Sequence, residues 1–384
     1  MLVGQQPQPA HTLADNLKQP IINFAKPETT GAGYIPAEAL LTVSDIPAKI
    51  EDRSDWYGPE LEKQPELWKY WLTSSDVEEI LTATNTFIDS GVDVALITKE
   101  KFSLPTLAPK LAQYRDELLN GRGFILIRGL PTHTLTRHQQ IVAFTGLGTY
   151  LGEMVPQNQK GHVLGHVKDI GHDAQKPETR FYATHEQQRF HTDGCDTVGL
   201  LCLQVSEEGG KSKVASSTRV WNQLSQERPD LAQVLLQYFY WDRKDEVVEG
   251  EAGYGLAPIA YYFKNRFMLH YDRNFLRTAA RHANVPALTP IQLEAIDYLE
   301  ATAEKNCLRM ELNVGDIQFV HNHQILHART SFRDSAEKTR HLLRLWLSTG
   351  GIGGWDLPWD PQGSRKRGGV HVKVQRETVP LEAE

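Results

Sequence analysis

The sequence of 384 residues contains only three cysteines, and they are scattered, at Cys195, Cys202 and Cys307. Such a set forms no disulfide framework and no CxxC zinc pattern, which favours a reducing compartment. No apolar run approaches the roughly 20 residues that span a bilayer. The N-terminal segment also lacks the basic region and apolar run of a secretory signal. We therefore expect a cytoplasmic protein with no membrane partner.

The sequence has no basic block either. Its 41 Lys and Arg residues are outnumbered by 48 Asp and Glu residues, for a formal net charge of -7. Nothing in it would neutralise a phosphate backbone, so nucleic acid is not an expected partner. With 40% hydrophobic and 23% charged residues, the composition is that of a globular protein. A small molecule is the expected partner, and the assembly state stays open, a homo-oligomer included.

The chain divides into a helical first part and a β-rich second part. Helical spacing of apolar residues occurs within 56–89 and 107–119, and a helix is expected at 135–152. GFILIRGL, at 123–130, reads as a buried strand among them. Helices are also expected near 219–239 and 289–304. After Val155, short β-rich runs alternate with turns, at 198–205, 212–217, 257–263, 266–271, 316–322 and 342–348.

Short strands that are mostly not separated by helices predict an antiparallel sandwich. We expect a mainly β fold with flanking helices (α+β), whose core is a double-stranded β-helix, or jelly roll, of cupin-like form. Three regions are expected. Residues 1–95 form a helical and extended region that packs on the core, 96–350 form the core domain, and 351–384 form a peripheral tail.

The segment RFHTDGCDTVG contains the most informative pattern. His191 and Asp193 are two residues apart, directly before a predicted strand. In extended backbone such residues project from the same face, so an imidazole and a carboxylate can reach one cation. A later segment, GDIQFVHNHQILHAR, offers His321, His323 and His327 as a third ligand. Two histidines and one carboxylate form the facial triad of iron(II) oxygenases.

The HxD pattern alone arises easily by chance in a chain with 15 histidines. The ordered set is more specific, because a His-rich strand end and an arginine-bearing strand follow it. A second metal site is not expected in GHVLGHVKDIGHD (161–173), which reads as a loop near the mouth of the site. Cys195 reads as a buried thiol, since no catalytic His–Cys signature accompanies it.

Four segments resemble the TauD/TfdA family of iron(II)/2-oxoglutarate oxygenases. They are FHTD (190–193), the Gly-Gly-Lys-Ser turn (209–212), GDIQFVHNHQILHAR (315–329) and RHLLRLWLS (340–348). GFILIRGLP (123–131) is similar to a strand that precedes the family's core. The resemblance spans about residues 100–350.

Carried over by position, the family's metal triad falls on His191, Asp193 and His327, which are therefore the expected catalytic residues. His327 is preferred because the family places this ligand at the end of an N-x-x-x-x-H run, and His323 is expected to be a hydrogen-bonded structural residue. For the far carboxylate of 2-oxoglutarate the resemblance implies an arginine and points to Arg344, seventeen residues past His327, rather than to Arg340. Arginine suits this role better than lysine because its planar fork can pair both oxygens.

Ser212 is expected to assist the arginine at the co-substrate. Arg329, Arg340 and His341 are expected near the substrate or the metal ligands, with an ion pair as the equal alternative for Arg329. The implied cofactors are Fe(II), 2-oxoglutarate and O2, and the implied reaction oxidises a C–H bond by hydroxylation, desaturation or ring closure, with release of succinate and CO2.

The resemblance implies a small anionic or zwitterionic substrate, such as an amino acid or an intermediate of secondary metabolism. Two other functions stay open. One is a zinc-dependent hydrolase or lyase on the same scaffold, which would not need Arg344 near the metal. The other is a non-catalytic binding module, which would not need an intact triad.

Overall fold

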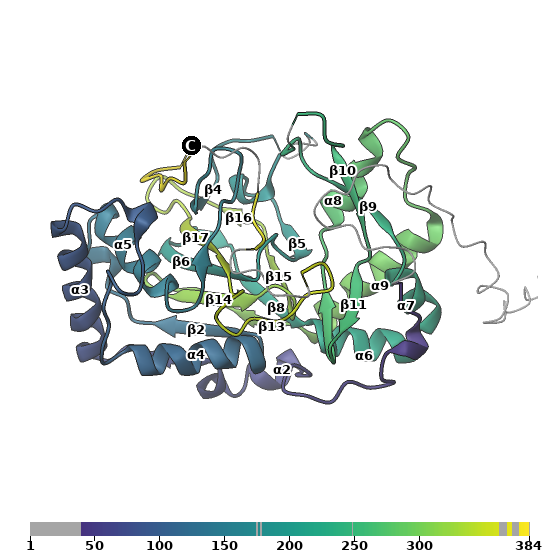
Figure 1. The fold of residues 1–384 in the computed structure, drawn as a ribbon, viewed down its shortest axis with the longest axis horizontal. Coiled ribbons are helices and arrows are strands. Elements are labelled where there is room, and N and C mark those ends of the chain that lie inside the picture. Colours follow the sequence, from purple (N-terminus) through teal and green to yellow (C-terminus); the bar gives the residue numbers. More distant parts are fainter. Residues whose placement is uncertain are drawn as a thin grey trace, which may run out of the picture.

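The computed structural model describes residues 40–383 except 174–175, 177–178, 248, 361–366 and 371–375. A seven-stranded sheet runs through its centre (Figure 1). In spatial order its strands are β1 (Lys69–Trp71), β2 (Phe124–Arg128), β14 (Ile317–His321), β6 (Thr197–Gln204), β17 (His341–Ser348) and β3 (Glu153–Met154), and β4 (Leu164–Lys168) also pairs with β17.

A four-stranded sheet packs against the first. Its order is β13 (Leu308–Met310), β8 (Ser212–Ser216), β15 (Ile325–Arg329) and β5 (Gln188–His191), all antiparallel. A small side ribbon pairs β7 (Glu208–Gly209) with β16 (Phe332–Arg333). The predicted jelly-roll core with flanking helices is confirmed.

The alternation of side chains along β17 shows why the two sheets face each other. Leu342 and Trp346 point inward and pack with Val214 and Ile325 of the smaller sheet. Leu343, Leu345 and Leu347 point outward into a second core. Since successive side chains of a strand project to opposite faces, Arg344 must share the inward face of Leu342 and Trp346.

Helices cover the outer face of the large sheet, at the left of Figure 1. They are α3 (Ser74–Asp89), α4 (Ala108–Asn120) and α5 (Arg137–Gly148). Thr73 and Thr136 cap α3 and α5 with capping boxes, which satisfy amide groups left free in the first turn. Ile80 and Phe144 are fully buried in the layer between helices and sheet.

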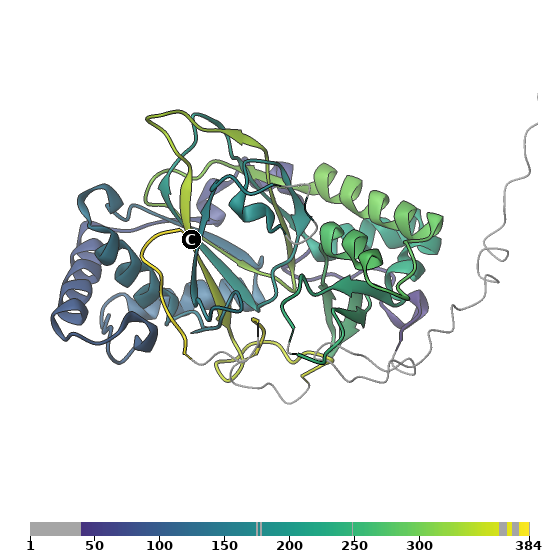
Figure 2. The ribbon, with the colours of Figure 1, turned by 90° about the horizontal axis from the view of Figure 1, so that it is seen from above.

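A second helical group lies at the opposite end of the molecule (Figures 1 and 2). It has its own apolar core, centred on residues such as Trp221 and Leu299. Its elements are α6 (Ser217–Glu227), α7 (Pro229–Leu235), α8 (Arg273–Thr278), α9 (Pro290–Asn306) and two hairpins, β9 (Phe239–Asp242) with β10 (Tyr254–Ala257) and β11 (Ala260–Phe263) with β12 (Arg266–Leu269). The short α2 (Gly58–Leu61) lies against β13.

Three local expectations were wrong. The helix expected near 219–239 is two helices, because Pro229 lacks an amide hydrogen and begins α7. Residues 164–168, expected within a loop, form β4, which pairs with the buried strand β17. Residues 69–71, expected in a helical stretch, form β1, which runs parallel to β2.

The tail is less peripheral than the sequence indicates. Trp355, Leu357 and Arg367 are buried, and Thr378 forms a β-bridge with His162. Among the described residues, no helix is both long and apolar enough to cross a membrane.

Candidate metal centre

Two of the three expected ligands lie directly opposite each other on neighbouring strands. His191 ends β5 and His327 lies within β15, and they are partners in the antiparallel register. Their ring centroids are 4.1 Å apart. Nδ1 of His191 lies 2.9 Å from the carbonyl oxygen of Arg189. Because this contact occupies Nδ1, Nε2 is the nitrogen left for a metal.

Asp193 follows β5 in the loop that leads to β6. Its backbone amide donates to the side-chain oxygen of Asn322, at 3.0 Å. This contact fixes the backbone position from which the Asp193 side chain extends. Its Oδ2 lies 3.5 Å from Nε2 of His327. One ligand atom from each of His191, Asp193 and His327 lies within 4.8 Å of the other two. The structure thus brings the three residues together, as the sequence predicts, and two imidazoles with one carboxylate suit iron(II).

The electrostatics of this group favour the protonation states that a metal needs. Burial, followed by the neighbouring charge of His327, lowers the pKa of His191 to about 3, so its ring is neutral. Burial alone would raise the pKa of Asp193, but the charge of Arg344 and the contact with His327 hold that pKa well below its ordinary value. Metal ligands of these types bind as neutral imidazole and ionised carboxylate.

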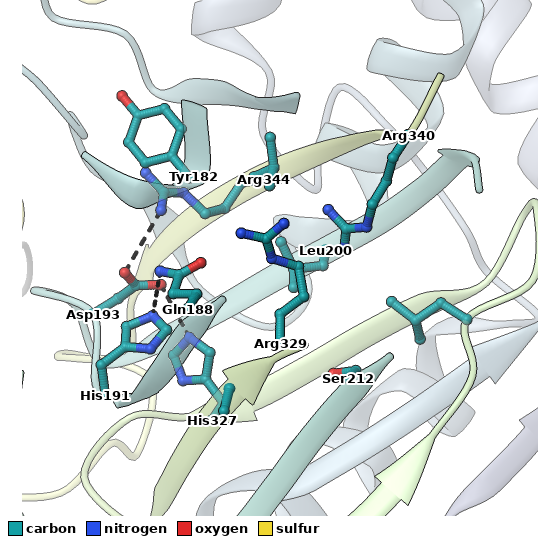
Figure 3. Close-up of a pocket in the computed structure, with 13 residues that line it drawn as sticks. Tyr182, Gln188, His191, Asp193, Leu200, Ser212, His327, Arg329, Arg340 and Arg344 are labelled. Carbon is teal, nitrogen blue, oxygen red and sulfur yellow. Dashed lines mark hydrogen bonds and ion pairs between the residues drawn. The ribbon is translucent and has the colours of Figure 1, made fainter. Parts of the chain in front are cut away.

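The pocket beside the three ligands contains all the residues that the sequence assigned to the co-substrate (Figure 3). Its lining combines a few apolar side chains with several cationic and polar ones: Val167, Tyr182, Gln188, His191, Asp193, Leu200, Ser212, Leu312, His327, Ala328, Arg329, Arg340 and Arg344.

Arg344 lies next to the ligands themselves. Its Nη1 is 3.6 Å from Oδ1 of Asp193, and its Nε donates to Oε1 of Gln157 at 2.8 Å. The guanidinium also lies over the rings of Tyr182 and Trp346, at 4.5 and 5.0 Å from their centroids. Arg344 is therefore already held by an acid, an amide and two aromatic faces.

Arg340 and Arg329 differ from Arg344 in having unpaired groups. Both are buried, and Nη1 of Arg340 and Nε and Nη1 of Arg329 have no hydrogen-bond partner. No carboxylate of a described residue lies within ion-pair distance of either. Burial lowers the pKa of Arg340 to about 10, and burial with the charge of Arg340 lowers that of Arg329 to about 9, so both stay cationic. The ion pair considered for Arg329 is absent among the described residues.

Three further expectations concern neighbouring residues. Nε2 of His323 donates to Oδ1 of Asp196, at 3.0 Å, and His323 lies in the turn between β14 and β15, so it is a hydrogen-bonded structural residue as expected. Cys195 is buried, and burial raises the pKa of its thiol well above the ordinary value. Ser212 lines the pocket and donates to Gln318, at 3.1 Å.

Sequence reasoning missed Gln188, Tyr182 and Gln157. Nε2 of Gln188 lies 2.9 Å from Nε2 of His191, at the position from which a metal would be ligated (Figure 3). Gln188 lies opposite Arg329 in the strand register, and only that pairing could have indicated it. Tyr182 lies in the short 3-10 helix Phe181–Ala183 and Gln157 lies in a loop, and strand periodicity gives no signal for either.

Comparison with known proteins identifies the family. A model described as the taurine catabolism dioxygenase TauD, TfdA family matches residues 89–346. The chain belongs to this family. It is therefore an oxidoreductase of the iron(II)/2-oxoglutarate dioxygenase class, as the sequence predicted, and the donor set of His191, Asp193 and His327 fits the family's iron.

Two similar proteins align with a larger share of this chain than the family model does. The taurine hydroxylase-like protein SAT17 of Stachybotrys chartarum is 31% identical over 312 residues, covering 78% of this chain and 80% of that protein. The FR-33289 synthase of Streptomyces rubellomurinus is 30% identical over 307 residues, covering 78% of this chain and 90% of that protein.

Solved structures share the fold. An asparagine oxygenase in complex with Fe(II), 2S,3S-3-hydroxyasparagine and succinate has a TM-score of 0.58 at 19% identity, covering 73% of this chain and 94% of that chain. The non-heme iron oxygenase OrfP in complex with Fe and alpha-ketoglutaric acid has a TM-score of 0.54 at 18% identity, covering 73% of this chain and 94% of that chain.

Proposed function

We propose that this family member oxidises a C–H bond of a small anionic or zwitterionic substrate, such as an amino acid, with iron held by His191, Asp193 and His327. One observation carries the proposal: three ligand atoms of the right types lie within 4.8 Å of one another beside a pocket rich in arginine. When bound there, iron(II) and 2-oxoglutarate would supply the oxidation, with O2 as the oxidant and succinate and CO2 as products.

For the far carboxylate of 2-oxoglutarate we propose Arg340, assisted by Arg329, rather than Arg344. Two methylene groups separate that carboxylate from the chelating end, so its partner must lie away from the metal ligands. Arg344 contacts Asp193 itself, whereas Arg340 and Arg329 face the same pocket with buried, unpaired donors (Figure 3). A buried cation without an anion is costly, and a carboxylate in the pocket would satisfy both.

We propose that the substrate binds at the end of the pocket near Asp193, which also carries charged groups. Burial lowers the pKa of Arg180, the charge of Arg344 lowers it further, and the charges of Asp193 and Asp272 raise it. Asp272 also forms a backbone bridge with His191. Arg344 lines the pocket and suits the carboxylate or sulfonate of a substrate. Arg180 is paired with Glu246 and would add positive potential, and Asp272 suits an ammonium group.

The chain's own residues would orient both molecules and exclude water. Val167, Leu200 and Leu312 form the apolar wall of the pocket, which would keep bulk water away from the oxidation and strengthen the charge contacts.

Two curated relatives, one named for a hydroxylase and one for the synthesis of FR-33289, are consistent with a natural-product substrate. The three cysteines are unpaired and buried, which supports a cytoplasmic site of action.

The experiment is a screen of amino acids and sulfonates for substrate-dependent O2 uptake coupled to succinate formation, with purified full-length chain, Fe(II) and 2-oxoglutarate. We expect one compound to stimulate both in equal amounts. Turnover with zinc alone and without O2 would support the hydrolase or lyase instead. Binding without any turnover under all conditions would support the binding module.

A further inference from the structure

The tail beyond the family match is bonded to the loop that carries Asp193. The backbone amide of Gly369 donates to the carbonyl oxygen of Gly194, at 2.6 Å, and the backbone amide of Val370 donates to the carbonyl oxygen of Pro156, at 2.9 Å. Arg367 is buried, and its Nε lies 3.0 and 2.9 Å from the two oxygens of Asp196. Residues 367–370, which we call the tail clasp, lie outside the matched residues 89–346.

Close approach of the clasp to this loop depends on glycine. Gly368 has a φ of +75°, and a Cβ built there would lie 2.9 Å from the carbonyl oxygen of Gly194 and 3.0 Å from Cα of Cys195. A side chain at Gly368 would therefore push the clasp away from the loop, and the left-handed backbone would also be strained.

Asp196 collects donors from three other parts of the fold. Besides Arg367, it accepts from the amide and the hydroxyl of Thr349, at 2.7 and 2.9 Å, and it lies 3.0 Å from Nε2 of His323. Only 1% of Asp196 is exposed. Burial alone would raise its pKa, but the hydrogen bond and charge of His323 and the charge of Arg367 hold that pKa well below its ordinary value. Asp196 is thus a buried carboxylate, and an arginine of the tail contacts both of its oxygens.

The loop is held on its other side by Asn322. This side chain accepts from the amide of Asp193 and donates to the carbonyl oxygen of Cys195, each at 3.0 Å. Residues 193–196 are therefore fixed between Asn322 and the clasp. A carboxylate ligand must be placed to within a few tenths of an ångström to share a metal with two imidazoles.

We infer that Arg367 is a positioning residue for the metal centre: by fixing Asp196, it sets where Asp193 stands relative to His191 and His327. This inference rests on the proposed function, since it takes Asp193 as a metal ligand. Partners that orient metal ligands are worth roughly tenfold to hundredfold in metal affinity. Removal of Arg367 takes away the arginine that contacts both oxygens of the buried Asp196, so the loop should rearrange to bring this carboxylate nearer to solvent.

The test compares Arg367→Ala and Arg367→Lys with Arg376→Ala in the full-length chain. Arg376 belongs to the same tail but is exposed and pairs with Asp93, far along the chain from the metal ligands. Each variant is titrated with Fe(II) under anaerobic conditions, and its metal-free unfolding is measured separately. We expect Arg367→Ala to lower iron affinity roughly tenfold to hundredfold, Arg367→Lys to recover part of it, and Arg376→Ala to match the unaltered chain.

The outcomes separate this inference from the proposed function. If the unaltered chain binds no Fe(II), or binds it equally well after Asp193→Ala, the proposed function fails. If the unaltered chain needs Asp193 but Arg367→Ala lowers only metal-free stability, with iron affinity of the folded protein unchanged, the inference is overturned. Should Arg367→Ala not fold, Arg367→Lys and Gly368→Ala decide by the same comparison, and unchanged affinity in both overturns it.

Discussion

Arg344 and Asp193 form a close pair inside the pocket, with Nη1 of the arginine 3.6 Å from Oδ1 of the acid. A guanidinium that contacts an expected metal ligand stands too close to the metal to receive the far end of a five-carbon co-substrate. Arg340, four residues earlier and directly before β17, lines the same pocket with a buried and unpaired Nη1. The two arginines should therefore have separable roles.

Arg340→Ala is expected to raise the apparent KM for 2-oxoglutarate by roughly tenfold to hundredfold, because a charge-assisted bidentate contact is worth about 1.5–3 kcal/mol. Arg340→Lys should recover only part, since an ammonium cannot fork across both oxygens. Steady-state kinetics at saturating substrate measure the effect. Arg344→Ala is the matched comparison and should raise the KM for the organic substrate instead. The reverse pattern would restore the sequence-based preference for Arg344.

His191→Ala and Asp193→Ala are each expected to abolish iron-dependent turnover while leaving the fold intact, because His191 ends β5 and Asp193 lies in the loop after it rather than in an apolar core. Asp193→Glu should fail as well, since the extra methylene moves the carboxylate oxygen within a small, buried site. Succinate formation and circular dichroism measure activity and fold. Full activity in either alanine variant, with iron occupancy verified, would exclude the triad.

Iron(II) is expected to raise the free energy of unfolding, because the three ligands converge only in the folded chain. At a free metal concentration of 100 times Kd the gain should be about 2.7 kcal/mol. Anaerobic urea unfolding with and without Fe(II) measures it. His327→Ala should remove most of the gain, whereas His133→Ala, at an exposed histidine, should keep it. An equal gain in both variants would place the metal elsewhere.

The metal-free protein is expected to lose stability as the pH falls below about 6.5. Burial, with the charge of Arg137, lowers the pKa of His341 to about 3 in the folded chain. Between these values the unfolded chain binds the additional proton, so the free energy of unfolding falls with falling pH, by at most about 1.4 kcal/mol per pH unit for this group. Urea unfolding of His341→Gln should show a shallower pH dependence than that of His133→Gln. Identical slopes would mean that His341 does not contribute.

Much of the centre was readable from the sequence because its determinants are local. Two-residue periodicity places His191 and Asp193 together and turns Arg340 and Arg344 to one face. The choice between these arginines was not readable, because it depends on how far each stands from Asp193 across the pocket. The strand β4 was missed for a related reason: the histidine-containing segment 161–173 was expected to be a loop, and only pairing with β17 explains a strand there.

The tail was misjudged because its composition is that of an exposed segment. Nothing in the local sequence near Arg367 indicates that its side chain is buried against Asp196, 171 residues earlier. Contacts of that kind are set by tertiary packing and leave no periodic trace. The same holds for Gln188, whose place beside His191 follows from the register of β5 and β15.

The pairing of His191 with His327 has a consequence for how the protein is made. After adding residue 191, the ribosome must add 136 more residues before the facing histidine exists. It must add still more before the tail clasp can contact the loop. Strand partners so distant in the chain pair late, since the loop between them must be ordered first. A nascent chain therefore offers no complete iron site, and metal loading must wait at least until His327 has been added.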